Sequence, residues 1–328
     1  MNDRLLKLLL LFCLPLALFG RQRTYDHLEP THPAYVPWFT GTLLPPSAVN
    51  ASPGHPILAP FVSFTVTYGE YDDNWNFKGT PNTWAINPYL EYLFGINDHI
   101  GVDIYASFIS NFKKGQSSTH LQDTTLLLGF QIARDTPNTW IPDIRLLLEE
   151  LVPTGNYQKL DPKKLGTDAT GQGSFQTGFN LIVQKLFPIN NNYLLLKWTL
   201  AYLFPAPVHV KGLNAYGGGK GTSGKVFPGQ TLFFYFSGEY SLTQRWVVGF
   251  DSLFEYQQKT PFSGNPGHML DGTPLPIGRG PLVQLTLSPQ VEYNLSSTSG
   301  FLFALWATVL GRNSSAFATA VAAYYICF

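Results

Sequence analysis

The amino-acid sequence predicts an all-β protein: a transmembrane antiparallel β-barrel of about 12 strands, preceded by a signal peptide. Three observations predict it. From residue 57 onward apolar and polar side chains alternate, the connections between these segments alternate between short and long, and the chain ends on an apolar strand that closes with Phe328. Lipid outside and water inside require the alternation, and short periplasmic turns with longer extracellular loops explain the connections.

The composition fits a barrel better than a bundle of membrane helices. Charged residues make up 13% of the 328 residues, about half the usual share, while aromatic residues reach 15%. The mean hydropathy is nevertheless +0.00, which is too low for a protein built of apolar helices. The formal net charge is +0, so we expect no nucleic-acid partner, which would require a basic surface.

Residues 1–20 read as a signal peptide. Arg4 and Lys7 form a positively charged start, and Leu8 to Phe19 form an apolar core. This core is too short to span a hydrocarbon layer of ~30 Å as a helix. After cleavage Cys327 is the only cysteine, so we expect no disulfide within the chain.

The next stretch, residues 21–56, is rich in Pro, His and Thr and shows no period. We interpret it as a periplasmic N-terminal segment. A flexible leader is the simpler interpretation, and a plug that braces the barrel from inside is the alternative.

The barrel domain is expected to span residues 57–328. Its clearest strand places Val283, Leu285 and Leu287 on one face and Gln284 and Thr286 on the other. Segments of this kind predict strands at 57–71, 82–96, 99–112, 120–135, 141–154, 173–187, 192–210, 230–242, 244–259, 281–295, 300–312 and 315–328.

The connections between these strands sort by length. Short turns are expected at 96–98, 135–140, 188–191, 242–243 and 296–300, and long loops at 71–82, 112–120, 155–173, 210–230 and 259–281. A soluble β-sandwich gives no reason for this sorting, whereas an outer-membrane barrel does. An even strand count also leaves both ends of the barrel on the periplasmic side.

The last strand places Phe328, Ile326 and Tyr324 on one face. This pattern resembles the C-terminal recognition signal of bacterial outer-membrane barrels, and the resemblance implies the barrel-assembly machinery as a partner. The expected location is the bacterial outer membrane. A buried final strand in a soluble β-protein is the alternative for this stretch alone.

Two charged residues interrupt the alternation. Glu150 falls on the face of Leu146 and Leu148, and Lys185 falls on the face of Val183. A charge facing the middle of a bilayer costs ~2–4 kcal/mol but much less near the interface. We therefore expect both residues at strand ends near the interface, or at a bulge.

One stretch resembles a known family. Pro153-Thr154-Gly155-Asn156-Tyr157, followed by Leu165-Gly166-Thr167, is similar to a loop edge in the outer-membrane family named for the meta-pathway of phenol degradation. The stretch Pro37-Trp38-Phe39-Thr40-Gly41 resembles the N-terminal region of some bacterial members. The family would cover nearly all of the mature chain. It implies a transporter-like barrel that passes small, often apolar compounds, and it brings no catalytic residues.

The alternation also predicts which ionisable side chains face the lumen. Acids outnumber bases among them, so they form either a pore lining that favours cations or a network that pairs charges across strands. At about 12 strands the lumen is narrow, so we slightly favour the charge-pairing network over the cation-selective pore lining. The predicted lumen-lining residues are Glu91, Asp103, Arg145, Glu149, Lys197, Glu239, Asp251, Glu255 and Glu292.

Catalysis, cofactors and metals find little support in the sequence. The histidines of the mature chain fall in the N-terminal segment or at turns, loops and strand ends, and no two His or Cys have metal-ligand spacing. The run from Gly217 to Gly224 lacks the spacing and the strand-to-helix context of a phosphate loop. We expect no enzyme, no cofactor and no metal. Lysines of the predicted loops 155–173 and 210–230 suggest lipopolysaccharide, beside membrane lipid, as a partner, and ordinary solvated loops explain the same lysines equally well.

Three functions remain after this reading. The first is a channel or transporter-like barrel for small, apolar or aromatic solutes. The second is a closed structural or surface-interaction barrel that transports nothing. The third, least favoured, is an enzyme embedded in a barrel.

Overall fold

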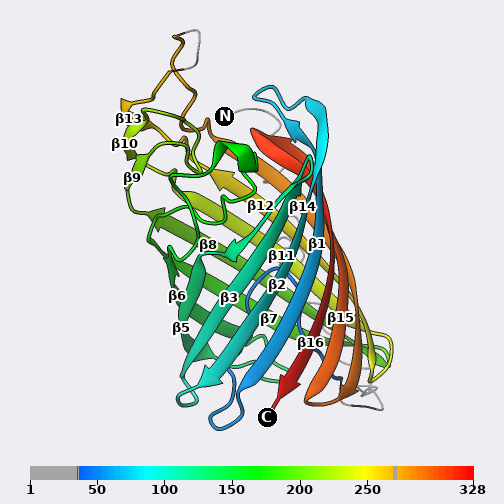
Figure 1. Cartoon of the computed structure of the whole chain (residues 1–328). Coiled ribbons are helices and arrows are strands. Elements are labelled where there is room, and N and C mark those ends of the chain that lie inside the picture. Colours follow the sequence, from blue (N-terminus) through cyan, green and yellow to red (C-terminus); the bar gives the residue numbers. More distant parts are fainter. Residues whose placement is uncertain (1–34, 36, 269–271) are drawn as a thin grey trace.

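The computed structural model describes residue 35, residues 37–268 and residues 272–328. The predicted signal peptide and residues 21–34 of the N-terminal segment lie outside the described residues. Across the described ranges no helix is both long and apolar enough for a membrane span. Figure 1 shows a closed barrel of tilted strands with a folded cap at one end.

Successive barrel strands pair antiparallel, except that β4 and β5 both pair with β3, and β1 pairs with β16 to close the wall. Strands β4 and β5 share one position in that wall, so the barrel is 12-stranded, which confirms the predicted fold class. The wall consists of β1 (Ile57–Tyr71), β2 (Phe77–Gly95), β3 (Ile100–Lys113), β4 (Gln116–Leu121), β5 (Thr124–Ala133), β6 (Asp143–Val152), β7 (Gln176–Ile189), β8 (Asn192–Pro205), β11 (Thr231–Ser241), β12 (Trp246–Gln257), β14 (Leu282–Ser296), β15 (Ser299–Arg312) and β16 (Ser314–Cys327).

Long connections gather at one end of the barrel and short turns at the other. We call these the extracellular and the periplasmic end, after the orientation that the sequence predicts. At the periplasmic end the closing strand meets the start of the barrel: Ile57 is paired with Cys327, and Phe328 N donates to Pro56 O over 3.0 Å. The apolar C-terminal stretch is thus the strand that closes the barrel.

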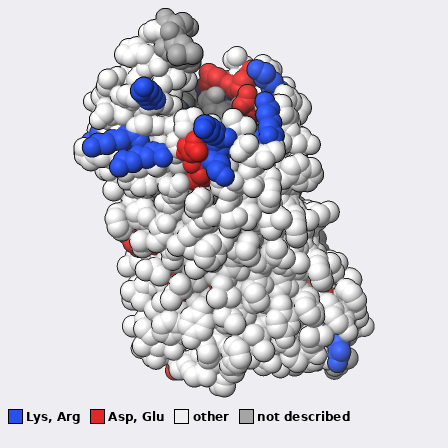
Figure 2. All heavy atoms as spheres, in the orientation of Figure 1, with Lys and Arg blue, Asp and Glu red and all other residues white. Residues whose placement is uncertain are grey.

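The alternation of side chains separates two environments. On β15, Phe301, Phe303 and Leu305 are 36%, 50% and 64% exposed on the outer face, whereas Leu302 and Ala304 on the inner face are 0% and 6% exposed. Figure 2 shows the consequence on one side of the molecule, a broad belt with very little charge around the barrel wall. Such an apolar belt is stable against lipid and would be unfavourable in water.

Two predicted strands are divided in the structure. The stretch expected at 120–135 breaks at Gln122 and Asp123, so that β4 pairs only with β3 while β5 pairs with β3 and β6. The stretch expected at 192–210 ends as a wall strand at Pro205. Proline has no N–H to donate to a neighbouring strand, and Pro207 follows two residues later, which ends the pairing.

The extracellular connections contain structure that the sequence did not reveal. Strands β9 (Val208–Lys211), β10 (Ser223–Val226) and β13 (Phe262–Asn265) form a separate three-stranded sheet, seen at the top of Figure 1. Its apolar core includes Val208, Val210, Tyr216 and Val226. The sequence predicts loops where β10 and β13 lie and places β9 at the end of the strand expected at 192–210, because strands of four residues carry too little alternation to be detected.

Two connections expected to be long are short. β2 begins at Phe77, so the loop after β1 covers only residues 72–76. β3 and β4 form a hairpin that turns at Lys114 and Gly115, whose φ angles of 46° and 79° are those of a tight two-residue turn. Because these connections are short, the paired strands β1 to β4 continue into the extracellular end of the barrel.

Residues 37–56, which we call the lumen segment, run inside the barrel. At its start, the hydroxyl of Tyr35 donates to Asn192 Oδ1 at the periplasmic end, over 3.0 Å. The segment then rises to an apex at residues 43–46 and returns to Pro56, beside the last residue of the chain. For these residues the flexible leader favoured by the sequence is wrong, because backbone and side chains bind the barrel wall at many points.

Candidate functional site

The nine predicted lumen residues all lie on strands of the barrel wall. Arg145, Asp251 and Glu292 are 0% exposed, and three more are at most 3% exposed. The other three are partly exposed: Glu91, Glu149 and Glu255. The structure therefore brings most of these charges against the lumen segment, and their contacts with it define the candidate site.

One wall of the site holds the rising half of the lumen segment by its backbone. Three carboxylate or amide oxygens from β12 and β14 accept hydrogen bonds from backbone amides, and an amide nitrogen donates to a carbonyl. These bonds join Thr40 N to Glu292 Oε2 (2.8 Å), Leu43 N to Gln290 Oε1 (3.0 Å), Leu44 N to Asp251 Oδ2 (3.0 Å), and Asn294 Nδ2 to Trp38 O (3.1 Å). Backbone recognition of this kind fixes the position of the segment.

The opposite wall holds the returning half, with Arg145 at the centre. Its guanidinium donates from Nε to Asn50 Oδ1 over 2.6 Å, from Nη1 to Ser47 O over 2.9 Å, and from Nη2 to Asp103 Oδ1 over 2.9 Å. Arg145 and Asp103 form the one fully buried ion pair in the described part of the chain. The planar guanidinium suits this role because it presents several donors in a fixed geometry.

Gln131 completes that wall. Its Oε1 accepts from Asn50 N over 3.0 Å, and its Nε2 donates to Ala48 O over 3.2 Å. Small residues let the backbone come close: a Cβ at Gly95 would lie 2.1 Å from Ala51 O. Sequence reasoning missed Gln131 and Gly95, because an isolated amide or glycine in a strand carries no signal of a distant backbone partner.

Lys197 lies between the two groups of residues that hold the rising and the returning half of the lumen segment. It is 3% exposed, and its Nζ approaches Pro46 O at 3.5 Å, the limit of a hydrogen bond. The acids whose charges act on it are Glu91, Glu239, Asp251 and Glu292. The charged groups around Lys197 are therefore mainly acidic.

Above the apex lies an extracellular cavity of about 680 Å³. Among the described residues its lining is aromatic, aliphatic and hydroxylic, with Lys113 as the single charged residue and no carboxylate. The apolar and aromatic side chains include Tyr89, Ile109, Leu165, Trp306 and Val321, and the polar ones include Ser63, Thr65, Asn87, Thr167 and Thr319. A cavity of this composition suits an uncharged, partly apolar molecule.

Below the apex lies a periplasmic cavity of about 380 Å³. It is lined by the lumen segment and by Glu91, Lys197, Glu239 and Cys327 of the wall. Leu43 and Leu44 line both cavities. The apex of the segment is therefore the partition between the extracellular and the periplasmic part of the lumen.

A second element enters the lumen from outside, residues 155–172, which we call the inward loop. Asp123 holds both of its ends: Oδ1 accepts from Gly155 N over 2.9 Å and Oδ2 from Gln172 N over 2.8 Å. Its tip contacts the wall where Asn111 Nδ2 donates to Thr167 O over 3.0 Å. The residues that carry the family resemblance thus form the base and the tip of this loop.

Glycine is required at the base of the inward loop. A Cβ at Gly155 would lie 2.6 Å from the Cα of Gly171, so the two ends of the loop could not approach each other with larger residues. Asn156 supports the same base, since its Nδ2 donates to Asp168 O over 2.9 Å. The Thr167 side of this loop borders the extracellular cavity.

The two residues that break the alternation differ in their surroundings. Lys185 Nζ binds Asp135 and the carbonyl oxygens of Thr136 and Ile141, so it caps a periplasmic turn as expected for an interfacial charge. Glu150 faces outward near the extracellular end of β6, where Thr177 Oγ1 donates to its carboxylate over 2.7 Å. Both lie near strand ends.

The described histidines belong to no group that could hold a metal ion. His55 bonds through Nδ1 to Phe328 O over 2.8 Å, at the exit of the lumen segment. Two others, His27 and His32, lie outside the described residues. In the part of the chain that the structure describes, no group of three or more His, Cys, Asp or Glu side chains is arranged to hold a metal ion.

Solved structures share the fold. The COG4313 outer membrane channel from Pseudomonas putida F1 aligns with a TM-score of 0.67 at 10% identity, covering 88% of this chain and 100% of that one. The AIDA-I transport unit from Escherichia coli gives 0.45 at 6% identity (97% of each chain), and the NalP translocator domain from Neisseria meningitidis 0.43 at 10% (84% of this chain, 88% of that one). No family model and no curated protein matches the sequence.

The first of these likenesses, at 10% identity, supports the fold alone. Together with the closed barrel and its uncharged belt, the shared fold of outer-membrane proteins places this chain in a bacterial outer membrane. The predicted location is confirmed, and membrane lipid is the partner of the outer face.

Proposed function

We propose that the protein is an outer-membrane channel for small, apolar or aromatic solutes, with the lumen segment as its constriction. The observation that carries the proposal is that Leu43 and Leu44 line both cavities. A solute that crosses the lumen has to pass this apex. We expect a displacement of this apex from the wall to connect the two cavities.

The solute class follows from the extracellular cavity. Its aromatic and aliphatic lining favours an apolar body, and its hydroxyl and amide groups offer hydrogen bonds to one or two polar atoms. The absence of carboxylates from that lining leaves little to hold a cation there. The resemblance to the phenol meta-pathway family implies the same class of solutes.

The lumen charges have two roles in this proposal. Arg145, Asp103, Asp251 and Glu292 hold the segment, so they act as a structural network. Glu91, Lys197 and Glu239 border the periplasmic cavity and line the exit of the path. Glu149 and Glu255 are the remaining lumen-lining acids, and no catalytic role is assigned to any of the nine.

A closed barrel that transports nothing is the second candidate. The observation that favours it is the number of hydrogen bonds that fix the segment on both walls, because a stable partition blocks the lumen. In either case we propose lipopolysaccharide as a partner of the extracellular end. We also propose the barrel-assembly machinery as a partner of the strand that ends at Phe328.

Liposome swelling and planar-bilayer conductance test the proposal on refolded protein. The substitutions Leu43→Ala and Leu44→Ala together shorten the apex without removing a hydrogen bond of the segment. We expect a severalfold rise in the flux of a neutral aromatic solute over the unchanged protein. The matched control replaces two lipid-facing leucines, Leu128→Ala and Leu305→Ala, and should leave the flux unchanged.

The two candidates give different results. A channel shows solute flux in the unchanged protein and more in the apex variant. A closed barrel shows no flux in either, even when the unboiled protein migrates as a folded species on a gel. Equal flux in the apex variant and the control would place the constriction elsewhere and overturn the role of the lumen segment.

A further inference from the structure

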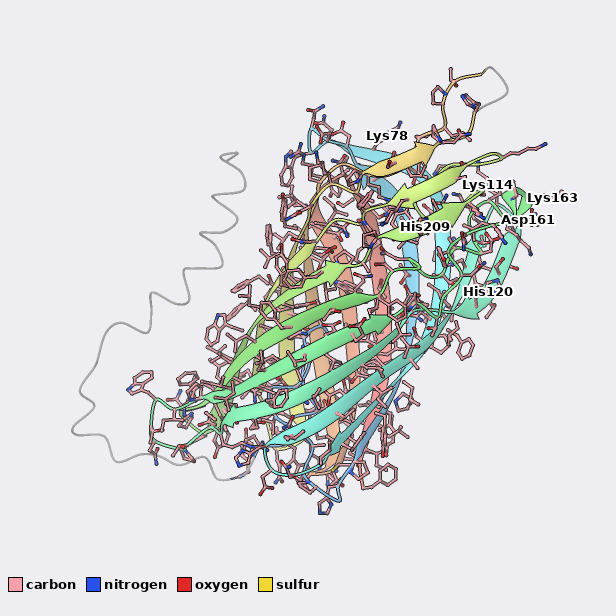
Figure 3. The ribbon with its side chains drawn as sticks, turned by 90° about the vertical axis from the view of Figure 1, so that its left-hand side faces the viewer. Lys78, Lys114, His120, Asp161, Lys163 and His209 are labelled. Atoms are coloured by element: carbon pink, nitrogen blue, oxygen red, sulfur yellow. The ribbon has the colours of Figure 1, made fainter. Side chains whose placement is uncertain are left out.

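Exposed lysines gather on one side of the extracellular end. We call Lys114, Lys159, Lys163, Lys164 and Lys211 the basic patch. Figure 2 shows basic side chains in a band above the uncharged belt, and Figure 3 shows Lys114 and Lys163 on the same side of the barrel. Four of the five are exposed, and Lys164 is partly exposed.

The patch is built from three connections that the fold brings together. Lys159 N donates to Lys211 O over 3.2 Å, which joins the inward loop to β9. Lys164 Nζ donates to Ser117 O over 3.0 Å, which joins the short helix η2 (Pro162–Lys164) to β4. Lys114 is the turn residue of the neighbouring hairpin. A shared position on a folded cap distinguishes these lysines from charges on separate loops.

No described residue neutralises the charge of the patch. None of its five lysines takes part in an ion pair with another described residue. The nearby acid, Asp161, uses Oδ1 to accept from Lys163 N over 2.9 Å, where it caps the first turn of η2. The patch therefore presents a concentration of positive charge to an external anion.

A groove of about 320 Å³ lies on the outer wall below the patch. It is lined mainly by aliphatic side chains of the lipid-facing belt: Val102, Leu126, Leu128 and Leu148. Its polar side chains include Glu150 and Thr177, which bond to each other, at the extracellular end of the groove. An apolar groove in this position is suited to a hydrocarbon chain.

The two features are separated by roughly the thickness of one leaflet. Ile104, the pairing partner of Leu126 in the groove, lies ten residues before Lys114 along β3. At ~3.3 Å per residue this is about 33 Å along the strand, or roughly 25 Å along the membrane normal at a tilt of ~40°. One leaflet with its headgroups is ~20 Å thick, so a lipid whose phosphates lie on the patch reaches down to about the level of the groove.

We propose that one lipopolysaccharide molecule binds this face, with its phosphates on the basic patch and an acyl chain in the groove. The outer leaflet of the outer membrane supplies a lipid with both features, a sugar headgroup bearing phosphates and several acyl chains. Lysine ammonium groups attract phosphate, and a cluster of them near the membrane surface selects anionic headgroups. The proposal rests on the outer-membrane location and not on solute transport, so either can fail without the other.

The binding test uses purified, refolded full-length protein in detergent with lipid A as the probe, read out by native mass spectrometry. The variant Lys114→Gln/Lys163→Gln/Lys164→Gln removes three charges of the patch. The matched control, Lys78→Gln/Lys220→Gln/Lys259→Gln, removes three exposed lysines from elsewhere on the same end. We expect at least a tenfold weaker affinity for lipid A in the patch variant and less than a twofold change in the control.

A second variant tests the groove. Leu148→Trp fills it with a larger side chain, and Leu305→Trp places the same residue elsewhere on the outer wall. We expect Leu148→Trp to weaken binding of lipid A but not of its deacylated phosphosugar, whereas the patch variant weakens both. Because both residues face outward, the barrel folds in either case, and the mobility of the unboiled protein checks it.

Three outcomes would overturn the proposal. The patch variant and its control could lose affinity equally, which would mean that lipid A responds only to net charge. Phosphatidylglycerol could bind as tightly as lipid A, which would reduce the site to a general anionic surface. Lipid A binding could also be insensitive to salt, which a phosphate–lysine contact at the surface excludes.

Discussion

Arg145 and Asp103 form an ion pair of 2.9 Å in the middle of the lumen wall, and at 0% and 1% exposure both side chains are out of reach of bulk water. The same guanidinium also binds Asn50 and the carbonyl oxygen of Ser47. One arginine therefore connects β6, β3 and the returning half of the lumen segment. Loss of this residue affects both the wall and the segment.

Replacing Arg145 by methionine should lower the free energy of unfolding by about 3–5 kcal/mol, because Asp103 is left buried without a partner. The measurement is the urea concentration at which the unboiled, compact gel band disappears. Arg245→Met, an exposed periplasmic substitution, is the control and should have little effect. A double variant that also replaces Asp103 by leucine should recover part of the loss, and no recovery would contradict the explanation.

Asp251 holds the apex through Leu44 N, and its substitutions should separate anchoring from charge. Asp251→Asn keeps an oxygen that can accept this hydrogen bond, whereas Asp251→Leu removes the acceptor. We expect the leucine variant to show more frequent openings in planar-bilayer recordings and the asparagine variant to resemble the unchanged protein. Equal behaviour of the two variants would show that charge, and not the hydrogen bond, controls the apex.

Gly95 allows the lumen segment to leave the barrel close to β2. An alanine there would place its Cβ 2.1 Å from Ala51 O, whereas Gly79 on the same strand has no atom within 4 Å of that position. We expect Gly95→Ala to expose residues 37–56 to an added protease, and Gly79→Ala to leave the digestion pattern unchanged. Protection of the segment in both variants would contradict the close approach.

Cys327 lines the periplasmic cavity and offers a chemical test of the path. A charged thiol reagent added from the periplasmic side should reduce the conductance, because the added group occupies a cavity of only about 380 Å³. Cys327→Ser should conduct normally and be insensitive to the reagent. Full conductance after complete modification, verified by mass, would place the path outside this cavity.

Asp73 joins the β1–β2 loop to the turn before β16, and this contact should depend on pH. Hydrogen bonds from Asn313 and Arg312 lower the pKa of the Asp73 carboxyl below its ordinary value of 3.8. A lowered pKa means that the contact is fully present above pH 3.8 and is lost as the pH falls through the lowered value. Because Asp73 is exposed, the effect is local.

The side-chain amide protons of Asn313 report this contact by NMR in detergent micelles. Their chemical shifts should stay constant from pH 7 to pH 5 and change only below about pH 4, the ordinary range of a carboxyl group. In Asp73→Asn the same signals should not titrate. A transition centred above pH 4.5 would contradict the lowered pKa.

The wall of the barrel was predictable because its physical cause is repeated in every strand. Lipid on one side and the lumen on the other impose a period of two, and residues such as Leu302 and Phe303 obey it independently of their neighbours. The lumen faces of Arg145 and Asp251 followed from the same rule. The hydrogen-bond partners of these two residues could not be predicted, because the alternation along a strand gives the face on which a side chain lies and not the residue that it contacts.

The lumen segment was not predictable because its contacts are distant and irregular. Leu43 binds Gln290, which lies 247 positions later, and neither residue has a sequence feature that points to the other. The break at Gln122 and Asp123 was hidden for a similar reason: the inward loop that fills it comes from residues 155–172. The small sheet of β9, β10 and β13 is too short in each strand to show a period.

The hydrogen bond from Phe328 N to Pro56 O joins the exit of the lumen segment to the seam between β1 and β16. The interior of the barrel and the closure of its wall therefore meet at a single backbone contact. Displacement of the lumen segment at this point removes a hydrogen bond from the seam as well as contacts from the lumen.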